Sequence, residues 1–335
     1  MFELIIVTAF LTSLLSLILL RPLAIKFSLV DYPTERKKHV GNIPLIGGIC
    51  VFLGCLISYF LFIEFDKFSS TLLITSSLIL MHGVWDDIVN LKAKTKIAFQ
   101  VFLSTIMIYI SDVKLENLGD LFGASYQFEL GILSIPVTII AVIALTNAIN
   151  MIDGLDGLAS GIVLLAITGL ICFNLTLEFS PSTSILLAIA SALLPFIICN
   201  IAPYPKIKVF LGGGGSLFLG YIISWALIYS AENINNFTPS FALWCVAIPL
   251  FDFFTVIIMR ILKKQPLMIA RKDHIHHYLE NFGFSKQLTL MLTVSSGLTI
   301  LLIGSFIENN FPALSFSIFL ILFLFYLFIR MYNNS

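Results

Sequence analysis

Long apolar segments constrain the fold of this chain more than any other feature of its sequence. Hydrophobic residues make up 59% of the 335 residues and charged residues only 11%, whereas about 25% of the residues in a soluble domain are charged. One buried core could not hold so many apolar side chains, so lipid must solvate the remainder. The composition therefore excludes a soluble, disordered or disulfide-scaffold protein and predicts an all-α integral membrane protein.

Eleven segments are apolar enough to cross a bilayer. A crossing takes about 20 residues, or fewer where a helix begins or ends inside the protein. We therefore expect about 11 transmembrane helices in a single polytopic membrane domain, residues 1–335. The first segment lacks a basic leader and a small-residue cleavage site, so we expect a retained helix rather than a signal peptide. The predicted spans are 2–20, 44–63, 70–85, 97–111, 131–149, 158–178, 184–201, 212–230, 240–260, 288–306 and 311–330.

The basic residues are divided very unequally between the two sets of loops. One set holds 17 of the 19 Lys and Arg residues, and the other holds only Lys67 and Lys114. Because Lys and Arg accumulate in cytoplasmic loops, we expect the rich set to be cytoplasmic, the amino terminus periplasmic and the carboxyl terminus cytoplasmic. Any active site should then lie on the cytoplasmic face. The loops expected to carry it are about 21–43, 86–96, 150–157, 202–215 and 261–287.

The first of these loops is basic and tightly turned. It contains Arg36, Lys37 and His39, followed by Pro44 and the glycine pair 47–48. A basic loop by itself can be a simple positive-inside anchor. The Pro and Gly-Gly residues at the start of a helix add a second interpretation, because they can bring backbone amides close to a phosphate.

Two adjacent carboxylates, Asp86 and Asp87, end the third apolar segment, and Lys92, Lys94 and Lys96 follow them. Neighbouring carboxylates repel each other, so a nearby cation is needed to keep both ionised. Mg²⁺ shared with substrate phosphates is one solution. The alternative is a solvated helix end whose carboxylates pair with the lysines.

A polar motif breaks the chain between the fifth and sixth apolar segments. Asn147, Asn150, Asp153 and Asp156 recur at every third position, which gathers them on one side of a helical or 3₁₀ turn. Two Asp-Gly pairs interrupt the helix there. Broken backbone at the membrane edge is tolerated only inside protein or facing a water-filled cavity, so a site is favoured over a plain polar turn.

Three histidines, His274, His276 and His277, follow Arg271 in the last long loop. They could bind zinc, but adjacent histidines point in different directions on a helix. With basic residues alongside, imidazoles that donate to a diphosphate fit the pattern better. Upstream, Asp252 lies inside the ninth apolar segment, and an intramembrane carboxylate is a functional-site hypothesis by default.

These motifs occur in a fixed order on one predicted membrane face. They are Asp-x-Pro-x-x-Arg-Lys-x-His, Asp-Asp, Asn-x-x-Asn-x-x-Asp-Gly-x-Asp-Gly, Phe-Leu-Gly-x-x-Gly-Ser, Ile-Pro-Leu-x-Asp and His-x-His-His. Together they resemble the polyprenyl-phosphate N-acetylhexosamine-1-phosphate transferases, from Asp31 to about Phe284. Within that family the chain is more similar to the WecA-type branch, the undecaprenyl-phosphate GlcNAc-1-phosphate transferases, than to the muramyl-pentapeptide (MraY) branch.

The resemblance implies a transferase of the bacterial cytoplasmic (inner) membrane with its active site facing the cytoplasm. The enzyme would transfer N-acetylhexosamine-1-phosphate from a UDP-N-acetylhexosamine to undecaprenyl phosphate and release UMP. The sugar phosphate expected first is GlcNAc-1-phosphate. Mg²⁺, or Mn²⁺ in its place, would be the cofactor. The product would start a cell-envelope polysaccharide such as the O-antigen of lipopolysaccharide. The lipid bilayer is an expected partner and nucleic acid is not, while homodimerisation, the sugar and the pathway stay open.

The resemblance also implies roles for individual residues. Asp86 and Asp87 would lie at the lipid phosphate, where we favour direct attack over base activation because that phosphate is already anionic at pH 7. Asn150 would hold Mg²⁺ with Asp87. Asp153 and Asp156 would line the nucleotide site, His274, His276 and His277 would hold the diphosphate, and Arg36, Lys37, His39, Lys96, Asn147, Arg260 and Arg271 would contact substrate.

Two positions depart from the family pattern. Gly213 stands where the family has an aspartate understood to be a principal Mg²⁺ ligand, and Arg271 stands where relatives usually have an aspartate, for which Asp273 can partly compensate. We favour an active enzyme weakened at its metal site over an engineered or accidental substitution or a noncatalytic descendant. A transporter is the remaining alternative, but transporters place polar residues near the midplane of two related halves.

Overall fold

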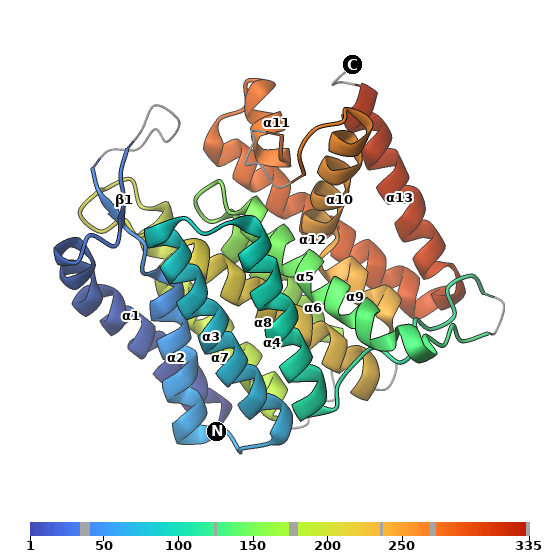
Figure 1. Ribbon diagram of the computed structural model, residues 1–335, viewed down its shortest axis with the longest axis horizontal. Coiled ribbons are helices and arrows are strands. Elements are labelled where there is room, and N and C mark those ends of the chain that lie inside the picture. The colour runs from blue at the N-terminus through green and yellow to red at the C-terminus, as the bar shows by residue number, and fades with distance from the viewer. Residues whose placement is uncertain (34–40, 124–125, 174–179, 235–236, 268–272, 333–335) are drawn as a thin grey trace. The chain divides into compact units, whose positions relative to one another are not determined.

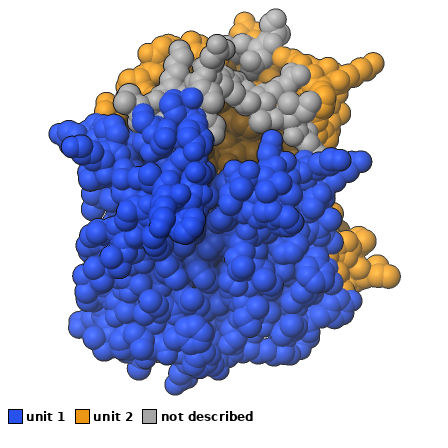
Figure 2. All heavy atoms as spheres, turned by 60° about the vertical axis from the view of Figure 1, so that its left-hand side comes forward, with its two compact units in different colours: residues 1–112, 176–222 blue, residues 113–175, 223–335 orange. Residues whose placement is uncertain are grey.

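The structure is a computed structural model that describes residues 1–33, 41–123, 126–173, 180–234, 237–267 and 273–332. Helices dominate it, and the described strands are the two-residue β1 and β2. The chain forms two compact units, residues 1–112 with 176–222 and residues 113–175 with 223–335 (Figure 2). Helix α8 (Gly213–Asn233) begins in the first unit, unit 1, and ends in the second, unit 2.

Each of the eleven predicted apolar segments contains a helix within the described residues, which confirms the all-α class (Figure 1). Within the described residues, eight helices are long and apolar enough to cross a membrane. A ninth candidate, α9 with α10, is bent by 87°, and the shorter apolar helices lie at Gly47–Phe62 and Leu158–Cys172. The chain is therefore a multi-helix membrane protein, while the count of eleven spans and the orientation of the termini stay predictions.

Unit 1 is built on α1, α2 and α7, which pack against one another, and on the antiparallel pair α3 and α4. Gly54 of α2 lies so close to α1 and α7 that a Cβ there would be 2.7 Å from the Ala9 carbonyl oxygen and 2.9 Å from Ala192 Cβ. Small residues allow two helices to approach this closely. Close packing matters in a bilayer, because lipid tails are apolar and the hydrophobic effect does not drive the helices together. The elements of this unit are α1 (Phe2–Lys26), β1 (Val30–Asp31), β2 (Ile43–Pro44), α2 (Gly47–Phe62), α3 (Lys67–Val89), α4 (Ala93–Ser111) and α7 (Pro181–Ile201).

A small backbone network fixes the start of α8 within unit 1. Strand β1 pairs antiparallel with β2, with Val30 opposite Pro44. Phe210 N–H donates to the Pro44 carbonyl, and its own carbonyl accepts from Gly47 N–H, each at 2.9 Å. Gly48 packs against the backbone of Gly215 with no room for a Cβ on either residue. The loop before α8 is thereby held against the first turn of α2.

Unit 2 is a helical bundle in which α12 contacts α6, α9, α10, α11 and α13. Trp244, at the end of α9, donates its indole N–H to Ser315 of α13 at 3.0 Å and leaves no space for a side chain at Gly304 of α12. The chain then bends sharply into α10. The elements are η1 (Gly131–Leu133), α5 (Ser134–Ile152), α6 (Leu158–Phe173), α9 (Pro239–Cys245), α10 (Ala247–Leu262), α11 (Ile275–Asn281), α12 (Lys286–Asn310) and α13 (Pro312–Tyr332).

The charge distribution gives a test of the predicted orientation. A reporter fused after Ser335 should be cytoplasmic, and one inserted near Asn117 should be periplasmic, because 17 of the 19 Lys and Arg residues lie in the opposite set of loops to Lys67 and Lys114. Paired alkaline phosphatase and fluorescent-protein fusions measure this. A periplasmic signal from the carboxyl-terminal fusion would show that the predicted topology is wrong.

Candidate active site

The first residue of the Asp-Asp pair in unit 1, Asp86, fixes the turn between α3 and α4. Helix α3 ends at Val89, and its C-cap residue Asn90 has a left-handed backbone with φ 56°. Asp86 Oδ1 accepts from Leu91 N–H at 2.7 Å, and Oδ2 accepts from Lys96 Nζ at 2.9 Å. The predicted substrate contact Lys96 is therefore paired with Asp86 across a partly exposed salt bridge.

The second, Asp87, lies over the amino-terminal end of α8. Its Oδ1 accepts from Gly213 N–H at 3.1 Å and its Oδ2 accepts from Gly214 N–H at 3.3 Å. The first N–H groups of a helix have no partner inside the helix, and the helix dipole favours a negative charge there. A Cβ built on Gly213 would lie 2.6 Å from Asp87 Oδ1. Glycine at position 213 thus leaves the space that the Asp87 carboxylate occupies.

The predicted Asn/Asp motif lies in unit 2, where α5 ends and α6 begins. Asn147 and Asn150 are half-buried in the last turns of α5, and Asn147 Nδ2 donates to the Ile143 carbonyl at 2.7 Å. The chain then leaves the helix through a turn that contains the half-buried Asp153 and Asp156. Gly157, with φ +79°, allows the chain to enter α6. The break in the helix at these residues is confirmed.

The histidine segment, residues 274–277, begins the short helix α11 in the same unit. His274 is its N-cap residue, and its Nδ1 lies 2.7 Å from Asp252 Oδ2. Ile275 N–H donates to Asp252 Oδ1, also at 2.7 Å. The intramembrane carboxylate of α10 therefore holds the start of α11.

His276 joins the histidine segment to the Asn/Asp motif. Its ring packs on Gly154 so closely that a Cβ on that glycine would overlap Nε2. The residue is 2% exposed, and neither ring nitrogen has a hydrogen-bond partner among the described residues. Burying a polar nitrogen without a hydrogen bond costs free energy. An unpaired buried group of this kind is therefore typical of a position that binds a ligand. The Asn/Asp motif and the histidine segment, both predicted from the sequence, are thus in contact in unit 2 through Gly154 and His276.

The local environment keeps His276 neutral. Burial lowers the pKa of the His276 imidazole to about 3, and the nearby His277 lowers it further while Asp252 opposes the shift. The two rings are 4.1 Å apart between centroids, and His277 Nδ1 lies 3.4 Å from Glu280 Oε2. A neutral imidazole offers one donor and one acceptor, so His276 can hydrogen-bond a phosphate without contributing charge.

Arg260, predicted to contact phosphate, forms a two-pronged ion pair in this structure. Its Nε and Nη2 donate to the two Asp273 oxygens at 2.9 and 2.8 Å, and Nη1 donates to the Leu267 carbonyl. Burial alone would raise the pKa of Asp273, but the hydrogen bond and charge of Arg260 outweigh it, so the pKa lies below its ordinary value. Arg260 thus holds both Leu267 and Asp273 against the end of α10.

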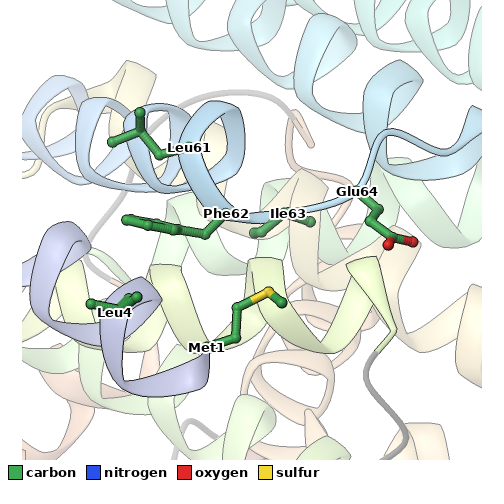
Figure 3. Close-up of a pocket in the computed structure, with 6 residues that line it drawn as sticks. All are labelled: Met1, Leu4, Leu61, Phe62, Ile63 and Glu64. Carbon is green, nitrogen blue, oxygen red and sulfur yellow. The ribbon is translucent and has the colours of Figure 1, made fainter.

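Several of the predicted site residues are not among the contacts described above. Arg36, Lys37, His39 and Arg271 lie outside the described residues. Within the described ranges, no group of three or more His, Cys, Asp and Glu side chains is placed to hold a metal ion. A pocket of about 490 Å³ lies in unit 1, and its lining residues are drawn in Figure 3. It is lined by Met1, Leu4, Leu61, Phe62, Ile63 and Glu64, so it contains none of the predicted site residues.

Sequence reasoning missed Arg330, which reaches this site from α13. In the sequence it counts only as one of the 17 Lys and Arg residues of the basic set of loops. In the structure its Nη1 donates to Asp252 Oδ1 at 3.1 Å. The only signal in the sequence was a single Arg next to a long apolar run, and that pattern is equally typical of a membrane anchor.

The structure places carboxylates, amides and imidazoles at the ends of apolar helices, and comparison with known proteins identifies the family to which such a chain belongs. Residues 69–231 match the glycosyl transferase family 4 model. The chain is 33% identical over 296 residues to the probable undecaprenyl-phosphate N-acetylglucosaminyl 1-phosphate transferase of Bacillus subtilis (strain 168), covering 86% of this chain and 80% of the relative. It is 31% identical over 299 residues to the undecaprenyl-phosphate alpha-N-acetylglucosaminyl 1-phosphate transferase of Escherichia coli (strain K12), covering 88% and 80%.

The chain therefore belongs to the polyprenyl-phosphate N-acetylhexosamine-1-phosphate transferase family, within its WecA-type branch. This confirms the resemblance predicted from the order of the motifs. The family assigns the chain to the sugar-phosphate transferases of membranes.

The contact between Gly154 and His276 predicts a steric effect. Gly154→Ala should displace the imidazole and lower turnover about 10- to 100-fold, because a misplaced site group costs catalysis steeply. Gly161→Ala in α6 is the control, since its Cβ would meet only Val294 Cγ2 at 3.2 Å. UMP release by both purified variants measures the effect. Equal turnover of Gly154→Ala and the parent protein would contradict the packing of His276 on this turn.

The buried, neutral state of His276 predicts a pH dependence of stability. Its pKa is about 3 in the folded protein against an ordinary 6.5, so below pH 6.5 the unfolded chain takes up the proton first. Stability at this site is therefore complete above pH 6.5 and decreases as the pH falls toward 3. Thermal unfolding in detergent between pH 4 and 7 should show a weaker pH dependence for His276→Phe than for the parent protein. Identical pH profiles would contradict this.

Proposed function

We propose that this protein transfers GlcNAc-1-phosphate from UDP-GlcNAc to undecaprenyl phosphate, giving undecaprenyl-diphosphate-GlcNAc and UMP. The observation that carries the proposal is the meeting of the histidine segment with the Asp153–Asp156 turn, where His276 is buried with both ring nitrogens unpaired among the described residues. Relatives that share about a third of its residues over most of the chain are named for this reaction.

The physical properties of the substrates support a site at a membrane surface. The polyprenyl tail of the acceptor needs lipid, whereas the UDP-sugar needs water, so their phosphates can react only at the boundary. We assign that boundary to the cytoplasmic side of the bacterial cytoplasmic membrane. The argument is that 17 of the 19 Lys and Arg residues lie in the loops that carry the polar motifs. The product would begin a cell-envelope polysaccharide.

In the proposed reaction, a phosphate oxygen of the lipid attacks the phosphorus that carries the sugar. The bond between that phosphorus and the bridging oxygen breaks, and UMP leaves with the bridging oxygen. The acceptor is already anionic at pH 7, so it needs no strong base, and catalysis depends on positioning and on charge stabilisation. The salt bridge to Asp86 holds the Lys96 ammonium near the end of α3, where Lys96 can contact a substrate phosphate.

The remaining roles follow from the contacts within unit 2. His276, neutral and unpaired among the described residues, can donate one hydrogen bond to the diphosphate. Asp153 and Asp156 in the adjoining turn can accept from the uridine or sugar hydroxyls. The Arg260 guanidinium can pair with a substrate phosphate when it releases the Asp273 carboxylate.

We propose Mg²⁺ as the cofactor, with Mn²⁺ as a substitute. Asp87 and Asn150 carry the oxygen donors that hard cations prefer, and Mg²⁺ in phosphate-transferring sites often has only one or two protein carboxylates, with substrate phosphates and water completing its shell. Each of the two side chains by itself therefore offers suitable donor chemistry, although Gly213 provides no ligand. When bound, the cation would neutralise charge on the diphosphate.

The second candidate function, a catalytically impaired family member, is favoured by one observation. Asp87 is bonded to the N–H groups of Gly213 and Gly214, where a side chain at position 213 would otherwise stand. The deciding experiment is a panel of UDP-GlcNAc, UDP-GalNAc and other UDP-sugars, assayed with undecaprenyl phosphate with and without Mg²⁺. Release of UMP with UDP-GlcNAc supports the transferase, and no release with any donor supports the noncatalytic alternative.

Removing single site groups should lower turnover without unfolding the protein. Asp87→Asn should reduce UMP release by about two to three decades, because the carboxylate charge is lost while the size is kept. His276→Ala should act similarly through lost diphosphate contacts. Circular dichroism and gel filtration in detergent check the fold. Turnover near the parent level in both variants would show that the site assignment is wrong.

Gly213 provides a further test. Gly213→Asp should raise turnover and lower the Mg²⁺ concentration needed for half-maximal rate, because it adds a carboxylate to a weakly liganded cation. The new Cβ must move the Asp87 carboxylate, which lies 2.6 Å from its position. Gly213→Ala separates this displacement from the added charge and should not lower the Mg²⁺ requirement. Equal Mg²⁺ titrations of all three forms would show that position 213 is not at the metal.

A further inference from the structure

The last span carries one buried charge at its carboxyl-terminal end. Arg330 is 2% exposed, although most of α13 is apolar and faces outward. Its Nη1 donates to Asp252 Oδ1 at 3.1 Å and to the Tyr326 hydroxyl at 2.7 Å, and its Nη2 donates to the Asp273 carbonyl. The guanidinium also lies 4.6 Å from the ring centroid of Tyr278 in α11. Arg330 therefore contacts the residues on either side of the histidine segment, Asp273 and Tyr278, and also Asp252 of α10.

Asp252 is the shared partner in this network. One oxygen receives Arg330 and Ile275 N–H, and the other lies 2.7 Å from His274 Nδ1. Hydrogen bonding at Nδ1 fixes the ring orientation and leaves Nε2 directed toward Asp273, at 3.8 Å from Oδ1. Helix α13 packs along α10, and both lie in unit 2 (Figure 1). Through Asp252, the last span is thus connected to the first residues of α11.

A buried ion pair is a poor choice if stability is all that is needed. Asp252 and Arg330 are each 2% exposed, and the cost of removing two charges from water often equals or exceeds their attraction. An apolar pair would pack at this position without that cost. What the pair supplies in addition is directional hydrogen bonds to His274, to the Ile275 amide and to the Asp273 carbonyl.

We propose that Arg330 and Asp252 are positioning residues that hold the histidine segment in place, so that His276 stays against the Asp153–Asp156 turn. Neither residue needs to touch substrate. The proposal rests on the proposed function for its effect on turnover, but the ordering of residues 273–278 is a property of the protein itself. The guanidinium fork, which bonds Asp252 and the Asp273 carbonyl at once, is the part that a lysine cannot reproduce.

The first test measures order directly, by hydrogen–deuterium exchange of the detergent-solubilised full chain. Arg330→Gln and Asp252→Asn should each speed exchange of the amides in residues 273–278 while leaving α5 unchanged. Arg330→Lys should give the same result as Arg330→Gln. Glu308→Gln is the matched control, because Glu308 is also a buried carboxylate of unit 2, bonded to Thr238 and Ser315 instead of the histidine segment.

The second test separates positioning from simple stabilisation. Each single variant leaves one buried charge unpaired and should lower the unfolding temperature, whereas the double variant Arg330→Gln/Asp252→Asn leaves none and should recover much of it. Turnover should fall about 10- to 100-fold in all three, because loose placement of a site group is costly. Stability that returns without turnover supports a positioning role.

Two outcomes would overturn the proposal. One is unchanged exchange of residues 273–278 in both single variants. The other is turnover that recovers together with the unfolding temperature in the double variant, which would make the pair purely structural. If the parent protein released no UMP with any donor, the proposed function would fail, and the exchange measurement alone would still decide whether the pair orders the histidine segment.

Discussion

Carboxylates that satisfy the backbone at helix ends are the interaction on which the rest of the site depends. The first N–H groups of a helix lack partners inside it, and in a membrane protein water cannot always supply them. Asp87 provides two acceptors at the start of α8, and Asp252 provides one at the start of α11. In the proposed function Asp87 would also hold the cation, and Asp252 would act on substrate only through the histidine segment. Under that proposal, folding and chemistry use the same groups.

This double use explains why position 213 is sensitive. Because Gly213 has no side chain, the Asp87 carboxylate can lie directly on the first N–H groups of α8. A carboxylate at position 213 would compete for that space. The structure therefore relates a departure from the family pattern to a specific rearrangement of Asp87, rather than to the loss of one ligand alone.

In unit 2, buried polar side chains are instead linked to one another by hydrogen bonds. Asp252 bonds the histidine segment and Arg330, while Arg260 bonds Asp273 just before that segment. The two ring nitrogens of His276, by contrast, have no hydrogen-bond partner among the described residues. A rigid network beside an unpaired imidazole suits a preorganised binding site, since the surrounding bonds hold the geometry and the imidazole can meet a ligand.

The sequence by itself determined the all-α membrane class, the positions of the apolar helices, the break after Asn150 and the family, because each depends on residues close together in the chain or on the order of motifs. It did not show the bend between α9 and α10, the pairing of Asp86 with Lys96 in preference to a free carboxylate, or any role for Arg330. Only the tertiary structure brought Gly213 to Asp87, 126 residues away, and Arg330 to Asp252, 78 residues away. Such contacts depend on how helices pack, and local periodicity carries no information about which helix faces which.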